Sequence, residues 1–310
     1  MSYHILSIDQ PDCTLTCSKG QLIMSYDHGE NRIPMEDVGA IIISSFKCSI
    51  TNHFLIEACR QRIGLVICDA HKPAAIVLPT DRVTDTQTIR NLAKMSATFK
   101  QRLWKKTVDA KCDNQAILAS QWAPTHPLCR ELATQASTLS EHKEAICAKL
   151  FWAIFGNAVA QSKFKRGRYE EGYNSLFNYG YAILLSSTLQ QLYAHGLDPI
   201  FGIFHQTREH ATPLAYDLME PFRPAFDANV ARWIQLQRAT GWQEEDIMQI
   251  STVYRSHIIK TLSAQVSYEG LEMPLRSALQ ASIASFRRAI TSKQVSPYKA
   301  WKISAIKWDG

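Results

Sequence analysis

The sequence lacks the short motifs of several common enzyme classes. It contains no GxGxxG and no GxxxxGK[ST] segment, so it has no recognisable cradle for a nucleotide cofactor. The spacings GxSxG and HExxH and those of zinc fingers are also absent. Its longest apolar runs fall far short of the roughly 18 residues of a membrane span, and its N-terminus has no basic, apolar leader. We therefore expect a cytoplasmic protein with no membrane partner.

The eight cysteines form no CxxC pair, and several of them lie inside apolar stretches. A thiol in such a setting behaves as a small hydrophobic side chain, which again indicates a reducing cytoplasm. Apolar residues make up 46% and charged residues 20% of the 310 positions. This composition excludes a disordered, collagen-like or coiled-coil chain, and the length favours two domains.

Residues 1–85 predict a small β-rich domain. One helix interrupts its strands, with Thr51 as the N-cap, and ends before Gly64. The polar segment 79–87 predicts a linker. Short β-rich runs between turn signals place the expected strands at residues 3–8, 14–17, 21–26, 40–44, 65–68 and 75–78.

From Thr88 onward the apolar period changes to 3.6, which is typical of helices, and the pattern recurs to about Thr291. We therefore predict an α+β protein in which a small β-rich N-terminal domain precedes a larger, all-helical domain at 86–293. Residues 294–310 are expected to form an irregular C-terminal tail.

The charge of the chain is distributed unevenly. Residues 1–90 hold 8 Lys and Arg against 10 Asp and Glu, whereas residues 91–310 hold 26 against 18. This asymmetry favours a polyanionic partner for the second domain, although a modest positive excess is also common on an ordinary solvated surface.

Asp217 and Glu220 stand three residues apart, so both lie on one face of a helical turn. Their flanking residues are mostly apolar, which predicts partial burial of two carboxylates that repel each other. A bound cation or the nearby Arg223 would relieve that repulsion. An exposed pair with Arg223 as its surface partner is the ordinary alternative.

His205 and Glu144 are the other candidates for a functional site. His205 ends an apolar run, and Glu144 continues an apolar helical stripe through positions 148, 151 and 155. A lone histidine in such a place is often a hydrogen-bonded core residue. Two or three carboxylates and one imidazole, without a thiolate, suit Mg²⁺ or Mn²⁺ with positions left for phosphate oxygens.

Basic and aromatic residues are interleaved in the segments 163–169 and 174–179. This composition is able to hold phosphates and stack bases. A charged helix end is the alternative interpretation. Arg223 is also a candidate DNA contact. The candidates in the two segments are Lys163, Lys165, Arg166, Arg168, Asn178 and Tyr179.

Four longer segments occur in a fixed order. With them, the chain resembles the CRISPR-associated adaptation integrases, the metal-dependent endonuclease-type subunits that insert new spacers, and the resemblance covers nearly the whole chain. The segments are E-x-x-x-A-K-x-[FY]-[FW] at 144–152, N-x-L-x-N-Y-G-Y at 174–181, G-L-D-P-x-x-G-x-x-H at 196–205 and D-L-M-E-P-F-R-P-x-x-D at 217–227.

The resemblance implies a homodimer formed through the β-rich domain, a helical catalytic domain, and a small ferredoxin-like partner subunit. By position, it makes Glu144, His205 and Glu220 the ligands of Mg²⁺ or Mn²⁺ and Asp217 an accessory catalytic residue. It implies double-stranded DNA, as prespacer and repeat, for substrate and 3′-hydroxyl transesterification for reaction. A repair nuclease that cuts branched DNA and a non-catalytic DNA-binding scaffold remain alternatives.

Overall fold

The structure, a computed structural model, has strands in its first 77 residues and mainly helices from residue 86 onward. This arrangement confirms the predicted fold class. The described residues are 4–8, 10, 12–43, 45–61, 63–69, 72–77, 86–140, 142–161, 164–167, 170–206 and 212–308.

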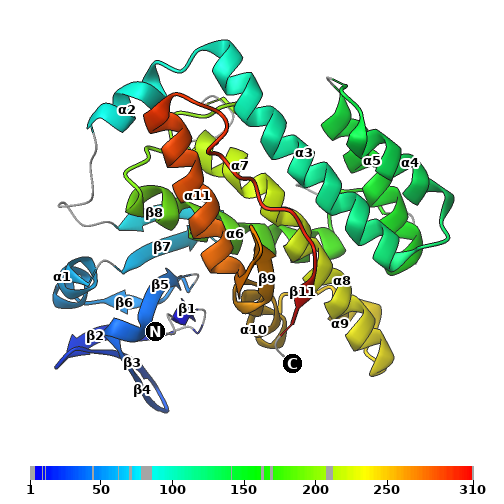
Figure 1. Ribbon diagram of the computed structural model, residues 1–310. Coiled ribbons are helices and arrows are strands. Elements are labelled where there is room, and N and C mark those ends of the chain that lie inside the picture. Colours follow the sequence, from blue (N-terminus) through cyan, green and yellow to red (C-terminus); the bar gives the residue numbers. More distant parts are fainter. Residues whose placement is uncertain are drawn as a thin grey trace.

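Two four-stranded sheets form the N-terminal part (Figure 1). The strands are β1 (His4–Ile8), β2 (Thr14–Ser18), β3 (Gln21–Tyr26), β4 (Gly29–Pro34), β5 (Val38–Ile43), β6 (Ser49–Ile50), β7 (Gly64–Asp69) and β8 (Lys72–Val77). The first sheet has the order β1-β5-β7-β8 and is parallel except for the β7–β8 pair. The second has the order β4-β3-β2-β6, in which β6 runs parallel to β2 and the others are antiparallel.

Helix α1 (Asn52–Arg60) begins where the sequence predicts, because the Thr51 side chain accepts a hydrogen bond from the Phe54 N–H at 3.3 Å. A short 3-10 turn, η1 (Met35–Asp37), precedes β5. Every predicted strand corresponds to an observed one, whereas β4 and β6 were not predicted.

The central strands of the first sheet separate two hydrophobic cores. Ile41 and Leu65 belong to the core of the N-terminal part, and their neighbours Ile42 and Val66 belong to the larger core of the helical part. This division follows from the strand geometry, since successive side chains point to opposite faces. Strands β5 and β7 are therefore a wall shared by both parts, and the domain boundary at residue 85 stays a prediction.

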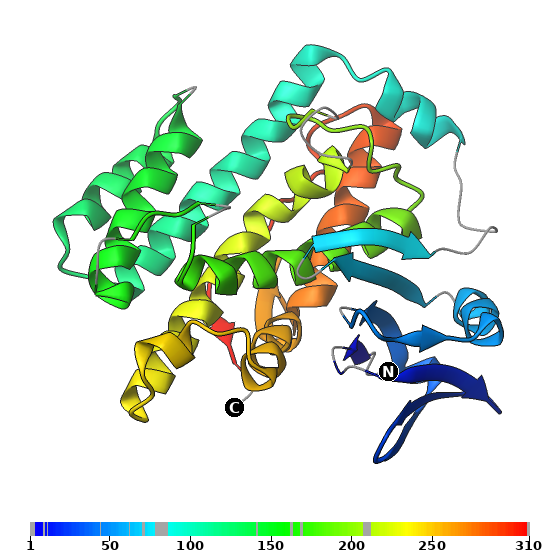
Figure 2. The ribbon, with the colours of Figure 1, turned by 180° about the vertical axis from the view of Figure 1, so that it is seen from behind.

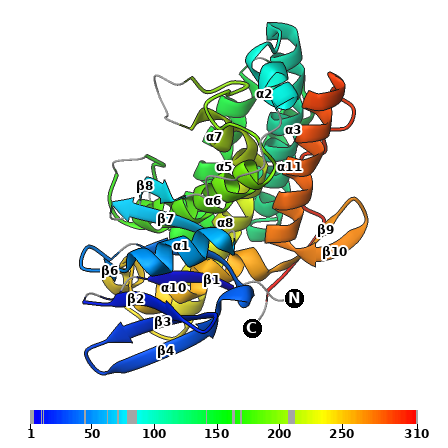
Figure 3. The ribbon, with the colours of Figure 1, turned by 90° about the vertical axis from the view of Figure 1, so that its left-hand side faces the viewer.

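The helical part is built around a long helix, α3, with α4 and α5 packed on its C-terminal half and α6 against the first sheet (Figures 1 and 2). Figure 3 shows the N-terminal strands gathered at one end of the molecule, beside these helices. The helices are α2 (Thr86–Ala93), α3 (Ala97–Trp122), α4 (Pro127–Ser137), α5 (Lys143–Phe155), α6 (Tyr173–Ala194), α7 (Pro213–Met219), α8 (Arg223–Ala239), α9 (Glu244–Ile247), α10 (Thr252–Ile259) and α11 (Leu275–Ser292).

Three shorter turns extend these helices: the π-helical turn η2 (Gly156–Ala160) and the 3-10 turns η3 (Glu220–Phe222) and η4 (Lys260–Ser263). The helical part also contains an antiparallel sheet in the order β10-β9-β11, formed by β9 (Gln265–Tyr268), β10 (Leu271–Pro274) and β11 (Ile306–Lys307). The prediction of an all-helical second domain is therefore wrong at these three short strands. Among the described residues, no helix combines the length and the apolar character needed to cross a bilayer.

The C-terminal tail packs against the helical part. Trp301 is 1% exposed and stacks on Phe222, with ring centroids 5.2 Å apart. The buried Asn114 side chain of α3 donates to the Pro221 carbonyl at 2.8 Å and accepts from the Ile303 N–H at 2.7 Å. Helix α3 and the tail thereby hold the turn η3 in place through Asn114 and Trp301.

Candidate active site

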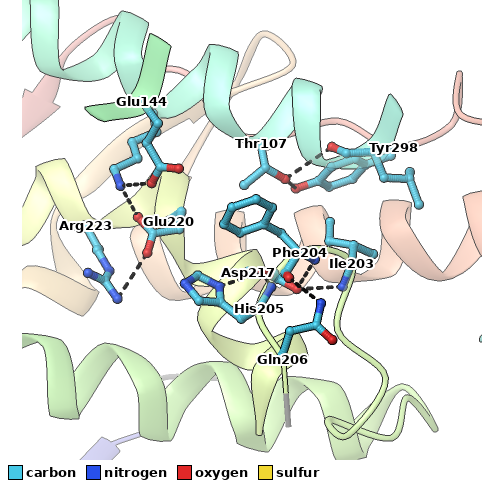
Figure 4. Close-up of polar contacts among 12 residues, drawn as sticks. Thr107, Glu144, Ile203, Phe204, His205, Gln206, Asp217, Glu220, Arg223 and Tyr298 are labelled. Atoms are coloured by element: carbon cyan, nitrogen blue, oxygen red, sulfur yellow. Dashed lines mark hydrogen bonds and ion pairs between the residues drawn. The ribbon is translucent and has the colours of Figure 1, made fainter. Parts of the chain in front are cut away.

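Four predicted site residues come together from separate elements (Figure 4). Glu144 lies in the first turn of α5, and Glu220 is the first residue of η3. Asp217 belongs to α7, and His205 lies in the loop that precedes this helix. Lys111 reaches the same cluster from α3.

The Lys111 ammonium links the two glutamates. Its Nζ lies 2.6 Å from Glu144 Oε1 and 2.5 Å from Glu220 Oε2. Burial by itself lowers the pKa of Lys111, but the charges of Glu220 and Glu144 outweigh this effect and leave that pKa raised. The ammonium therefore stays charged and holds the two carboxylates together.

Glu220 is an ionised carboxylate in a buried place, with only 2% of its surface exposed. Arg223 Nη2 lies 3.1 Å from its Oε1. Burial tends to raise the pKa of Glu220, but Arg223 and Lys111 more than offset this and leave the pKa lowered. The sequence-based expectation that Arg223 compensates this carboxylate is confirmed, although Glu220 is buried and Arg223 is only partly exposed.

The Asp217 carboxylate holds the His205 loop in place. Asp217 has no exposed surface, and its Oδ2 accepts from the backbone N–H groups of Ile203 at 2.6 Å and Phe204 at 3.1 Å. Its Oδ1 accepts from the backbone N–H of His205 at 3.1 Å. Three backbone donors of one loop therefore converge on this carboxylate, which gives it a supporting role.

The same oxygen also orients the imidazole, since His205 Nδ1 lies 2.7 Å from Asp217 Oδ1. With Nδ1 engaged in this way, Nε2 is the nitrogen that can serve as a ligand. Burial lowers the pKa of His205, but the hydrogen bond and charge of Asp217, aided by Glu220, prevail and leave it raised.

Gly202 allows the loop to fold this tightly. A Cβ at this position would lie 2.5 Å from the His205 backbone oxygen and 2.8 Å from the Cβ of Pro213. Both distances are shorter than real contacts of this kind, so a side chain at residue 202 would displace the loop. The glycine is needed here for close approach of the backbone.

The donor set suits a hard divalent cation. Glu144 and Glu220 supply carboxylate oxygens, and the Asp217–His205 hydrogen bond is the arrangement usual behind a metal-binding imidazole. Among the described residues, however, no three His, Cys, Asp or Glu side chains are grouped so that they could hold a metal ion as they stand. The Lys111 ammonium stands between the two carboxylates, so a divalent ion would replace one cation with another at a place that demands positive charge.

A second polar cluster adjoins the first through Arg223, whose guanidinium lies 4.7 Å from the centroid of the Tyr181 ring. The Tyr181 hydroxyl donates to Asp227 Oδ1 at 2.5 Å. The Arg166 guanidinium lies 5.3 Å from the centroid of the same Tyr181 ring, and its Nη2 donates a hydrogen bond to Asn178 Oδ1 at 2.9 Å. The Tyr181 ring therefore contacts both arginines and helps to hold the Arg223 guanidinium in place.

The predicted DNA-contact residues differ in their exposure and in their partners. Lys163 and Arg168 lie outside the described residues. Lys165 is exposed, with 83% of its side chain accessible, and pairs with Glu170. Tyr179 is 4% exposed and packs near Tyr254, so its ring serves the core.

Arg166 and Asn178 bond to each other, and Arg166 is held among aromatic rings, so both residues have internal roles. Their contact with DNA stays a prediction. The Arg223 guanidinium likewise forms an ion pair with Glu220 and lies over the Tyr181 ring, and its contact with DNA stays a prediction.

Lys111, Trp104 and Asp227 lie at or beside the site but were not among the predicted site residues. A signal for Lys111 was present, because it continues the buried stripe of α3 that includes Leu103, Thr107 and Leu118. A cation on such a stripe needs an anionic partner. Which anion it meets depends on how α3 packs on α5 and η3, and the local sequence does not contain that information.

Comparisons with known proteins give a consistent result. The family model described as "CRISPR associated protein Cas1" matches residues 6–262. A CRISPR-associated endonuclease Cas1 from Neisseria meningitidis serogroup C is 27% identical over 300 residues, which cover 94% of each chain.

Two solved structures share the fold. A casposase bound to its integration product aligns with a TM-score of 0.78 at 20% identity, covering 98% of this chain and 96% of the casposase. A chain of a Cas6-RT-Cas1–Cas2 complex aligns with a TM-score of 0.74 at 17% identity, covering 97% of this chain and 36% of the other. With the family model matching most of its length, the chain belongs to the Cas1 family of CRISPR-associated proteins.

Proposed function

We propose that this protein is a DNA integrase that depends on Mg²⁺ or Mn²⁺ and inserts new spacers into a CRISPR repeat array. The observation that carries the proposal is that Glu144 and Glu220 share one cation, the Lys111 ammonium, while the carboxylate of Asp217 orients the imidazole of His205. Family membership and the fold shared with a casposase bound to its integration product support it.

The reaction is a transesterification. The 3′-hydroxyl oxygen of the incoming DNA forms a bond to a phosphorus of the repeat, the bond from that phosphorus to the 3′ oxygen of the repeat strand breaks, and the proton lost by the nucleophile balances the one gained by the leaving hydroxyl. A bound divalent ion would polarise the phosphate and favour the ionised nucleophile. No water is consumed, and no covalent protein intermediate forms.

The protein's own residues set the stage for this exchange. Glu144, His205 and Glu220 would hold the ion, and Asp217 keeps the imidazole ring in orientation. Arg223 keeps Glu220 ionised from one side. Its positive charge also favours the negative charge that accumulates on the phosphate oxygens.

The partners in this proposal are double-stranded DNA, a second copy of the chain, and a small ferredoxin-like subunit. The chain of the Cas6-RT-Cas1–Cas2 complex with the same fold supports a Cas2-type partner. The homodimer is proposed to form through the β-rich N-terminal part.

A joining assay tests the reaction class. The protein, with its partner subunit and Mn²⁺, is given a labelled duplex with free 3′-hydroxyl ends and a supercoiled plasmid that carries a repeat. Labelled plasmid is the expected product. The same duplex with dideoxy 3′ ends should give none, because the hydroxyl is the nucleophile.

The assay also separates the alternatives. Nicking that is indifferent to the 3′ block and to the partner subunit would contradict the integrase and favour a repair nuclease. DNA binding without joining or nicking, with Mn²⁺ present, would favour a scaffold.

The same assay tests the candidate metal ligands through the variant Glu144→Gln, which should abolish joining. Its matched control is Glu272→Gln, which changes an exposed glutamate far from the cluster in sequence.

A further inference from the structure

Two aromatic rings stack beside His205. Trp104 of α3 and Phe204 lie with ring centroids 4.3 Å apart and planes 3° from parallel. Both rings also meet the imidazole edge-on, at 5.9 Å for Trp104 and 5.5 Å for Phe204. Figure 4 shows the Phe204 ring between α3 and His205. We call this pair the aromatic platform.

The platform is open on the outside. Phe204 is 51% exposed, whereas its neighbour Ile203 is only 6% exposed. A phenyl ring half in water forgoes much of the stabilisation that burial would give. Trp104 already flanks the imidazole, so the orientation of His205 does not by itself account for a second, exposed ring.

We propose that the aromatic platform binds an unpaired nucleobase of the DNA strand whose end enters the site. This inference rests on the proposed function. A base stacks on an aromatic side chain through its flat face, which every base has, so the contact tolerates any sequence. The two rings touch His205, and a base stacked there would belong to a nucleotide at or next to the reacting end.

We expect the occupant to be single-stranded. A base inside a duplex has both faces covered by its neighbours and the end pair has one face free, whereas an unpaired nucleotide is also free to rotate its face onto Phe204. Lys100 lies one helical turn before Trp104 on α3, on the same side of the helix, and is half-buried. We expect its ammonium to contact a phosphate of that strand.

An abasic scan tests the platform. Duplexes carry a short 3′ overhang in which one nucleotide at a time is replaced by a tetrahydrofuran abasic unit, and their affinities are measured with wild type and with Phe204→Leu, Phe204→Tyr and Phe46→Leu. Leucine keeps apolar volume and removes the aromatic face, and tyrosine keeps the face. Phe46, 78% exposed in the N-terminal part, is the control.

In wild type, one or two overhang positions should lose about tenfold in affinity when the base is removed. That loss should disappear in Phe204→Leu and persist in Phe204→Tyr and Phe46→Leu. Mn²⁺ affinity, measured in parallel, should be the same in Phe204→Leu as in wild type. If the ring had only a structural role, its removal would disturb His205 and lower the Mn²⁺ affinity.

Two results would overturn the platform: a flat abasic scan in wild type, or an equally strong base dependence in Phe204→Leu. Either result, obtained while the protein still joins 3′-hydroxyl ends, refutes only the platform. Failure of joining together with failure to bind any DNA would refute the proposed function itself.

Discussion

At the scale of single residues, the candidate site depends on contacts between side chains that lie far apart in the sequence. Glu144, His205 and Glu220 stand out because each is polar in an apolar setting. Lys111 lies 33 positions before Glu144, and only the packing of α3 on α5 brings its ammonium to 2.6 Å from that carboxylate. A contact of this kind is tertiary and leaves little trace in local spacing.

Asp217 illustrates the same limit. Its spacing from Glu220 suggested two carboxylates acting on one helical face. In the structure α7 ends at Met219 and a 3-10 turn follows, so Asp217 serves the His205 loop and Glu220 meets Lys111 and Arg223. Two neighbouring acids therefore have different partners and different roles.

Asp227 makes a prediction about pH. Burial raises the pKa of Asp227 from its ordinary value of 3.8 to about 7, although the Tyr181 hydroxyl and the nearby arginines oppose this. Because this pKa is higher in the folded than in the unfolded chain, the stability it contributes is complete below about pH 4 and is lost progressively as pH rises from there through 7. Asp227→Asn keeps an oxygen for Tyr181 but cannot ionise.

Between pH 6 and 8, wild type should therefore lose about 1 kcal/mol of unfolding free energy relative to Asp227→Asn. Urea unfolding of both proteins at the two pH values measures this difference. An unchanged difference between them would show that Asp227 is already ionised in the folded chain at pH 6, which would contradict its raised pKa.

At the scale of elements, some pieces of the fold carry too weak a pattern to be predicted. Strand β4 is almost wholly exposed and contains charged and polar residues, so it has no apolar alternation. Strands β9, β10 and β11 have two to four residues each and lie among helices. The longer helices and α1 with its Thr51 cap were predictable, because period and capping chemistry are local.

The loop before α7 depends on Gly202. Gly202→Ala should displace the loop, because the new methyl group would meet the His205 backbone oxygen and Pro213. A shift of about 1 Å at a reacting group costs on the order of a hundredfold in rate, so joining should fall by about that factor. The measurement is the initial rate of 3′-end joining at saturating Mn²⁺.

Gly64→Ala is the matched control for that loop variant. The nearest atoms to a Cβ at Gly64 belong to the flexible side chain of Gln190, which can move aside. Its joining rate should stay close to that of wild type. Equal rates for the two alanine variants would contradict the role given to Gly202.

At the scale of the whole molecule, the boundary between negative and positive net charge does not coincide with a boundary between the two hydrophobic cores. The net charge changes sign between the N-terminal and helical parts, but β5 and β7 contribute side chains to both cores. The sequence predicts the first division through simple counting. The shared wall follows from which face of a strand meets α6, and strands buried on both faces show no alternation to reveal it.

The positive helical part should dominate DNA binding. Duplex affinity should fall at least about a hundredfold between 50 and 200 mM salt, as expected for four or more neutralised phosphates. Lys165→Gln should lower the salt slope by about one unit, and Lys47→Gln, an exposed lysine of the N-terminal part, should leave it unchanged. A salt-independent affinity, or equal effects of the two variants, would contradict this division.

The central claim is that Glu144, His205 and Glu220 hold a divalent cation, and Mn²⁺ binding measured by electron paramagnetic resonance tests it most directly. Glu144 is part-exposed, with 29% of its side chain accessible, so Glu144→Gln should fold normally. Wild type and the control Glu272→Gln are predicted to bind one Mn²⁺ per chain with the same affinity, and Glu144→Gln to bind at least tenfold more weakly. Equal Mn²⁺ affinity in Glu144→Gln and wild type would contradict the claim.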